Sequence, residues 1–284
     1  MKNPIGYNLD RSPVTAMISS VQNPLIKQIR KLHRTRERQE QNLSLIEGTH
    51  LLETALALNC SLETVCYTEK WQQRQAELAE KFQNQAKRVE IVSPEVLASL
   101  ATTVNPDGVI ATIARDHLHP VPQNPLQLGL VLERLQDPGN LGTIIRTAVA
   151  TEVQGIWLSL DSVEIDNPKV IRSSAGEWFR SPLVVESDLS ALVKKYQAQG
   201  VKAIATLPTA TKSHWEIDFT RPTLILLGNE GAGLSPQLAA LADETVKIPL
   251  FGGVESLNVA IATAVILYEA RRQLSYSSGL FQLK

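Results

Sequence analysis

Apolar residues in the second half of the chain occur in short unbroken runs, and segments with helical spacing separate these runs. The runs cover residues 128–132, 155–158, 203–206, 224–227 and 246–250. Unbroken apolar runs of this length are typical of strands buried on both faces, and their alternation with helices indicates a parallel sheet. We therefore expect an α/β domain over residues 128–284, with its ligand beyond the carboxyl ends of the strands.

The first half of the chain predicts a smaller α/β domain over residues 19–114. Its first helix should begin at Asn23-Pro24, because asparagine caps helices well and proline suits the first helical position. The pattern then predicts helices over residues 51–58 and 71–82 and from Pro94, and strands over residues 62–67, 89–92 and 109–114.

Two segments fall outside these domains. Residues 1–18 are expected to form a loose extension, because polar and charged residues are scattered through them and the apolar stretch of a secretion signal is missing. Residues 115–127 contain three prolines and no amphipathic period, which indicates a semi-rigid linker.

The formal net charge of -1 hides a local positive excess. Between Pro24 and Arg38 the basic residues face a single acid, Glu37, while apolar positions give the same helix a buried face. A solvated helix face is the ordinary explanation of such a charge run. The alternative is a nucleic-acid contact, for which the candidate residues are Lys27, Arg30, Lys31 and Arg34.

Neither a metal site nor a membrane span is expected. Cys60 and Cys66 have no zinc or redox spacing, and the five histidines do not cluster near them, which favours a reducing cytoplasmic setting. The longest apolar stretch, residues 259–268, is too short to cross a bilayer, so we expect a buried helix there.

The first of three segments with candidate chemistry covers residues 137–148 and follows the strand at 128–132. A Pro-Gly turn precedes Asn140, which we expect to cap a helix whose free N–H groups suit an anion. Arg146 lies two turns into that helix and offers a planar fork for a phosphate. A capped helix with an ordinary surface arginine is the alternative.

The second segment places Gly228, Gly231 and Gly233 directly after a buried strand. Their order, G-x-x-G-x-G, is not the dinucleotide fingerprint, but glycines here allow a ligand to approach the backbone closely. A plain strand-to-helix turn would explain the glycines equally well. It does not explain Glu230, which is set in the same turn.

The third segment covers residues 248–260. A strand should end near Pro249, a Gly-Gly loop follows, and Ser256 is expected to cap a long helix that reaches about Gln273. Asn258 would then lie just inside that helix, where capping does not account for it.

Together, the three segments resemble the signature motifs of the SpoU/TrmH family of tRNA and rRNA ribose methyltransferases, within the SPOUT superfamily. The family patterns are D-P-x-N-x-G-x-I-x-R-x-A, G-x-E-G-x-G and I-P followed by S-L-N-V, and residues 173–176 resemble a further family feature. Asn23-Pro24, Glu47-Gly48 and Pro106-x-Gly108 resemble the family's N-terminal RNA substrate-binding domain. Asp107 departs from relatives that carry a polar uncharged residue.

This resemblance implies a catalytic domain with a trefoil knot and S-adenosylmethionine as its cofactor. It also implies homodimers formed through the knotted domain, without a metal. The cofactor-binding residues that it implies are Thr206, Leu227, Gly228, Ile248, Leu250 and Leu257.

The resemblance gives catalytic roles to five residues. Arg146 would grip a phosphate and orient the ribose, and Asn140 and Asn258 would orient that arginine and the ribose. Glu230 would pair with Arg146 or with the partner subunit, and Ser256 would shape its loop or contact the substrate. The implied reaction is methylation of a ribose 2′-hydroxyl, and the two-domain layout favours 23S rRNA over tRNA.

Two other functions remain to be weighed. A catalytically inactive RNA-binding protein that assists ribosome assembly could keep the same fold. A nicotinamide-dependent dehydrogenase is disfavoured, because the glycine fingerprint is missing after the first strand of the larger domain.

Overall fold

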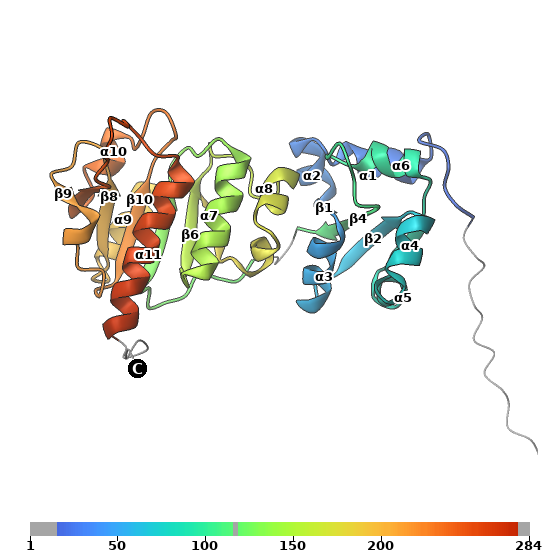
Figure 1. The fold of residues 1–284 in the computed structure, drawn as a ribbon, viewed down its shortest axis with the longest axis horizontal. Coiled ribbons are helices and arrows are strands. Elements are labelled where there is room, and N and C mark those ends of the chain that lie inside the picture. Colours follow the sequence, from blue (N-terminus) through green and yellow to red (C-terminus); the bar gives the residue numbers. More distant parts are fainter. Residues whose placement is uncertain (1–15, 116–118, 278–284) are drawn as a thin grey trace, which may run out of the picture.

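Two β-sheets, one in each half of the chain, organise the fold (Figure 1). The computed structural model describes residues 16–115 and 119–277. Most of the predicted extension, residues 1–15, and part of the predicted linker, residues 116–118, lie outside the described residues. Within these bounds, the helices are too short or too polar to cross a membrane.

The first sheet has four strands in the order β1-β4-β2-β3. Its strands are β1 (Leu43–Glu47), β2 (Leu62–Tyr67), β3 (Arg88–Ile91) and β4 (Val109–Ala114). The pair β2–β3 is parallel and the other pairs are antiparallel. This sheet confirms the strands expected near residues 62, 89 and 109, whereas β1 was not expected.

Six helices surround this sheet: α1 (Pro24–Lys31), α2 (Thr35–Gln41), α3 (Thr49–Ala57), α4 (Glu69–Arg74), α5 (Ala76–Gln85) and α6 (Pro94–Leu100). The expected start of α1 is confirmed, because the Asn23 side chain accepts a hydrogen bond from the amide of Leu25. The expected single helix over residues 71–82 is wrong. Gln75 leaves the helical conformation, and the resulting bend lets Trp71 of α4 stack on Phe82 of α5, with ring centroids 5.8 Å apart.

The second sheet has seven parallel strands in the order β7-β6-β5-β10-β8-β11-β9. Their bounds are β5 (Leu128–Leu132), β6 (Gly155–Ser159), β7 (Leu183–Glu186), β8 (Lys202–Thr206), β9 (Lys212–Ser213), β10 (Thr223–Leu227) and β11 (Glu244–Lys247). The parallel α/β fold is confirmed, and so are the five predicted strands, although β11 ends before Ile248. The knot implied by the family resemblance stays a prediction.

Helices cover both faces of this sheet. On one face, α7 (Pro138–Ala150) packs against α8 (Pro168–Ser173) and α11 (Val259–Ser277), as Figure 1 shows. On the other face lie α9 (Leu189–Gln197) and α10 (Pro236–Ala239), whose apolar side chains join a separate core. The strand order reverses between β5 and β10, and such a switch point is where ligands bind in open α/β sheets.

The last helix differs from its prediction in burial and length. Ala260, Ile266 and Leu267 are buried, but Ile261 and Tyr268 are 51% and 58% exposed. Only one face of α11 therefore packs on the sheet, and among the described residues its neighbours include α7 and the short turn at His214–Glu216. The helix also continues to Ser277, beyond the expected end near Gln273.

A buried ion-pair network joins the two domains. The Arg38 side chain is almost fully buried and pairs with Glu164, and its Nε donates to Asp166 Oδ2 at 3.3 Å. Arg115 Nε lies 2.9 Å from the same Asp166 oxygen, and the Ser44 hydroxyl also donates to it. Removing one partner from such a network leaves a buried charge unpaired at a cost of several kcal/mol. The network therefore fixes how the first domain sits on the second.

His119, at the junction of the domains, gives a testable pH dependence. Burial beside Trp178 lowers the pKa of His119 to about 4, although the backbone of Trp178 and Ser181 and the charge of Asp166 act in the opposite direction. A neutral imidazole therefore stabilises the folded state above pH 6.5, and this contribution is lost as the pH falls toward 4. We expect protonation of His119 in the unfolded state to lower the free energy of unfolding by about 3 kcal/mol between pH 7 and pH 4.

Chemical denaturation of the wild type and of His119→Phe across this range measures the effect. The phenylalanine variant keeps an aromatic ring against Trp178 but has nothing to titrate, so its stability should fall less steeply with pH. Parallel pH profiles of the two proteins would contradict the assignment.

Candidate functional site

Three loops meet at one edge of the second sheet. They follow β5, β10 and β11, and they are the three segments that the sequence marked for chemistry. Because parallel strands direct their carboxyl ends to the same edge, the loops come together although they are distant in sequence.

Polar side chains join the three loops in one chain of hydrogen bonds. The Asn258 side-chain amide donates to Asn140 Oδ1 at 2.9 Å, and the Asn140 amide donates to Glu230 Oε1 at 3.2 Å. Glu230 also accepts from the backbone amides of Asp137, at 3.0 Å, and Gln136, at 3.2 Å. Each of the predicted residues Asn140, Glu230 and Asn258 comes from a different loop, so this series of hydrogen bonds holds the three loops together.

Hydrogen bonding sets the ionisation of Glu230. Partial burial favours the neutral acid, but the Asp137 backbone amide, with further donors that include Asn140, outweighs it and lowers the pKa of Glu230. The side chain is therefore an ionised acceptor at neutral pH. A carboxylate held in this way is a weak base and a good anchor for amide groups.

Two helix caps differ from the sequence interpretation. The cap of α7 is Asp137, whose Oδ1 accepts from the amide of Asn140 at 2.8 Å, so Asn140 is not the cap. The cap of α11 is Asn258, whose Oδ1 accepts from the amide of Ala260 at 2.9 Å, so Ser256 is not the cap. α7 begins at Pro138 and α11 at Val259, which leaves the Asn140 side chain free to bridge the loops.

The loop after β10 is a tight turn that needs glycine. A Cβ added to Gly228 would lie 2.1 Å from the backbone of both Gly233 and Leu234. Asn229 braces the turn: its Oδ1 accepts from two amides of the loop, and its Nδ2 donates to the carbonyl of Arg134 at 2.8 Å. Asn229 was not expected from the sequence, although asparagine side chains often close turns by accepting from the amide two residues later, here that of Gly231.

A cavity of about 430 Å³ opens between the loops after β8, β10 and β11. All of the residues expected at the cofactor line it: Thr206, Leu227, Gly228, Ile248, Leu250 and Leu257. Glu230 and Ser256 line it as well, while Asn140 and Asn258 lie outside its wall. Thr206 Oγ1 is buried and has no hydrogen-bond partner among the described residues, and a bound ligand could satisfy such a group.

The loop over residues 248–257 has few internal restraints. None of its backbone groups forms a backbone–backbone hydrogen bond with another described residue. Residues 251–257 are all exposed, and Phe251 is 77% exposed. Ser256 belongs to this loop and makes no side-chain hydrogen bond to the rest of the described chain. The loop can therefore adapt to a ligand or to another protein surface.

Arg146 is not brought into this site within a single chain. It is exposed on α7, about 9 Å along the helix axis from Asn140, and it forms no ion pair or hydrogen bond with the described residues. Within the described residues, Glu230 bonds to the loop after β5, and its expected ion pair with Arg146 is not among these contacts. Pairing with a partner subunit stays a prediction.

The candidate RNA-binding residues lie on the first domain. Lys27, Arg30 and Lys31 are exposed on α1, which turns Ile26 and Ile29 into the core, and Arg34 is exposed just before α2. In Figure 1, α1 and α2 occupy the upper side of the first domain, the side on which α11 begins. The basic helix and the start of α11 therefore lie on the same side of the molecule.

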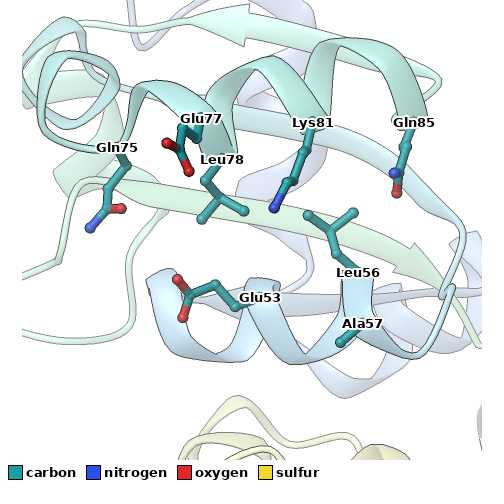
Figure 2. Close-up of a pocket in the computed structure, with 8 residues that line it drawn as sticks. All are labelled: Glu53, Leu56, Ala57, Gln75, Glu77, Leu78, Lys81 and Gln85. Carbon is teal, nitrogen blue, oxygen red and sulfur yellow. The ribbon is translucent and has the colours of Figure 1, made fainter.

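A second hollow, of about 370 Å³, lies between α3 and α5 (Figure 2). Leu56 and Leu78 contribute apolar surface, and Glu53, Glu77 and Lys81 contribute charges of both signs. It is on the lower side of the first domain in Figure 1, away from the three loops. Within the part of the chain that the structure describes, no cluster of His, Cys, Asp or Glu could hold a metal ion.

Known protein families match both halves of the chain. Residues 127–268 match the SpoU rRNA Methylase family, and residues 23–111 match the MRM3-like substrate binding domain. An uncharacterized tRNA/rRNA methyltransferase of Synechocystis is 52% identical over 91% of this chain and 94% of its own length. The 23S rRNA (guanosine(2553)-2′-O)-methyltransferase RlmP of Bacillus subtilis is 32% identical over 89% of this chain and 98% of its own length.

Solved structures agree with this match. The AdoMet-bound rRNA methyltransferase of Sinorhizobium meliloti superposes with a TM-score of 0.80 at 31% identity, over 92% of this chain and 98% of that one. The SpoU methyltransferase AviRb of Streptomyces viridochromogenes, in complex with AdoMet, gives a TM-score of 0.77 at 29% identity, over 89% and 98% of the two chains.

Proposed function

Because the chain belongs to the SpoU rRNA methylase family, we propose that it methylates a ribose 2′-hydroxyl of 23S rRNA with S-adenosylmethionine. The observation that carries the proposal is the cavity beside the hydrogen bonds that join Glu230, Asn140 and Asn258. There the loops could hold a cofactor and a ribose together. Relatives that match most of this chain are named for 2′-O-methylation of 23S rRNA. Such an enzyme works where ribosomes are assembled, in the cytoplasm.

We propose the domain boundaries expected from the sequence. Residues 19–114 form the RNA substrate-binding domain and residues 128–284 the methyltransferase domain, with an extension over 1–18 and a linker over 115–127. The two separate sheets and the two family matches support this division.

The cavity has the properties that S-adenosylmethionine requires. When bound, this cofactor supplies a methyl group that is activated by a positively charged sulfur. Leu227, Ile248, Leu250 and Leu257 would provide apolar walls for it, and Gly228 would let the backbone approach it. Thr206 Oγ1 would find in the cofactor the hydrogen-bond partner that it lacks among residues 16–115 and 119–277.

The remaining site residues orient the acceptor. Glu230 holds the Asn140 side chain, and Asn140 in turn holds Asn258, so that these amides are fixed where a ribose must lie. Arg146 would grip a phosphate of the substrate, and Ser256 would contact substrate or shape its loop. A guanidinium group donates hydrogen bonds and accepts none, and Glu230 is a weak base, so neither Arg146 nor Glu230 is suited to remove the hydroxyl proton.

A homodimer completes this site in our proposal. Ile261 and Tyr268 on α11 and Phe251 in the adaptable loop are large apolar side chains with more than half of their surface exposed. We propose that these side chains are covered by the second subunit, because exposed apolar side chains that gather in one patch mark interaction sites. Arg146 is exposed on the neighbouring helix and does not line the cavity of its own chain, so a second copy is needed to bring an arginine to each cavity.

The basic face of α1 is proposed to bind the RNA backbone. Reversing the charge at Lys27, Arg30 and Lys31 should weaken RNA binding and lower the slope of log K against log salt by about 2 to 3. Filter binding of a 23S rRNA fragment from 50 to 200 mM salt measures both quantities. Binding of S-adenosylhomocysteine should be unchanged in this variant, and an unaltered RNA affinity at low salt would remove α1 from the proposal.

The proposed activity is tested by transfer of a tritiated methyl group. Undermethylated 23S rRNA from a strain that lacks this protein should accept label on a ribose, and mapping of the label identifies the nucleotide. A ribosome-assembly protein without catalytic activity would bind the same RNA and transfer no label. That result, obtained with protein that binds S-adenosylhomocysteine, would overturn the proposal.

A further inference from the structure

We propose that Lys169 binds a backbone phosphate of the substrate RNA next to the three loops and so helps to place the target nucleotide. This inference rests on the proposed function and adds a substrate contact to it. It concerns α8, which lies between α7 and the first domain (Figure 1).

Lys169 stands directly beside the loop after β5. Its Nζ lies 3.7 Å from Asp137 Oδ2, while the other carboxylate oxygen of Asp137 caps α7. The lysine side chain extends past Gly139, where an added Cβ would lie 3.7 Å from Lys169 Cε. Since the Asp137 amide donates to Glu230, the ammonium group is a short distance from the residues that join the loops.

Folding stability does not explain a lysine at this position. Lys169 is in the first turn of α8, where the helix dipole disfavours a positive charge. The side chains of Lys169 and Asp137 are 57% and 49% exposed, and an exposed ion pair at this distance contributes little to stability.

The charge of Lys169 has a clear use if RNA lies on this edge. Asp137 and Glu230 place two carboxylates where a polyanion must approach, and their repulsion would raise the free energy of the bound RNA. An exposed ammonium group beside Asp137 reduces this repulsion and offers donors to a phosphate oxygen.

The backbone of α8 is held firmly, so the Cα of Lys169 has a fixed position. At the other end of α8, Arg172 lies 3.3 Å from the buried carboxylate of Glu47 in the first domain. Ser173 packs against Gly142 of α7, and its hydroxyl donates to the carbonyl of Pro138 at 3.2 Å. α8 therefore has fixed positions relative to both the basic face of α1 and the catalytic loops.

The test compares Lys169→Gln with the control Lys194→Gln, which removes an exposed lysine from α9 on the opposite face of the sheet. Loss of one phosphate contact should lower the slope of log K against log salt by about 0.9, or about 0.7 for single-stranded RNA, and weaken binding about fivefold at 0.15 M salt. The KM for RNA should rise by a similar factor, while the affinity for S-adenosylhomocysteine stays the same. Lys169→Arg, which keeps the charge, should restore most of the RNA affinity.

Three outcomes separate this inference from the proposed function. Suppose that the wild type and Lys194→Gln methylate RNA, and that Lys169→Gln shows the same KM for RNA and the same salt slope as they do. Lys169 then does not contact a phosphate. If Lys169→Arg is as impaired as Lys169→Gln, charge is not what matters at this position, and the inference is equally wrong. If the wild type itself transfers no methyl group, the proposed function fails first.

Discussion

Replacing Arg146 with alanine should lower the rate of methyl transfer by about 10²- to 10³-fold or more and leave cofactor binding almost unchanged. The size of the effect follows from the role we propose, because a group that orients the reacting ribose supplies several kcal/mol of the lowering of the barrier. Cofactor binding should survive because Arg146 does not line the cavity and bonds to no other described residue. Tritium transfer and calorimetry with S-adenosylhomocysteine measure the two properties.

The lysine variant refines this prediction. Arg146→Lys keeps the positive charge and loses the planar fork, so it should recover only a small part of the activity. Full activity in Arg146→Ala would show that the arginine has no part in the reaction. Loss of cofactor binding in the same variant would show that its role is structural.

Replacing Gly228 with alanine should strongly weaken cofactor binding. The new methyl carbon would lie 2.1 Å from the backbone of both Gly233 and Leu234, and because these are backbone atoms, the whole turn would have to open. The apolar walls of the cavity would separate, so we expect the affinity for S-adenosylhomocysteine to fall by about 100-fold or more, which corresponds to about 3 kcal/mol.

Gly231 provides the matched control in the same loop. A Cβ added to Gly231 would have Asn229 Oδ1 as its nearest neighbour, at 3.7 Å, which is an ordinary contact. Gly231→Ala should therefore bind the cofactor product nearly as well as the wild type does. Normal binding by Gly228→Ala, or an equal loss in both variants, would contradict this account of the turn. Circular dichroism of both proteins reports whether the fold is retained.

The two inactive proteins also test the proposed homodimer. A mixed dimer would contain one subunit with an intact cavity, from Arg146→Ala, and one with an intact arginine, from Gly228→Ala. If the arginine of one subunit serves the cavity of the other, co-expression of the two variants should restore part of the activity. No recovery in mixed dimers of demonstrated composition would mean that both residues act within one chain.

The sequence predicts the buried strands better than the edges of the sheet. β5, β6, β8 and β10 are runs of apolar residues because both of their faces are covered. β7 lies at an edge and leaves Val185 43% exposed, and β9 has only two residues, so neither gives an apolar run that stands out. Burial on both faces is what the pattern detects, and edge strands lack it.

The site was predictable where its residues belong to one segment. Each of the three segments contains a residue that joins the loops, and all six residues expected at the cofactor line one cavity. The caps were placed wrongly, because Asp137 and Asn140 are both good caps and only the backbone decides between them. Lys169 was missed because its neighbour, Asp137, is distant in sequence and the fold alone brings them together.

The buried Arg38 network has a consequence for the choice of substrate. Glu164 and Asp166 hold the first domain against the second through Arg38. The distance from the basic helix to the three loops is therefore fixed. An RNA must present a backbone segment to the basic helix and its target nucleotide to the three loops at that distance. A short oligonucleotide that carries only the target nucleotide should thus be a poor acceptor, and the three-dimensional shape of the RNA becomes part of what is read.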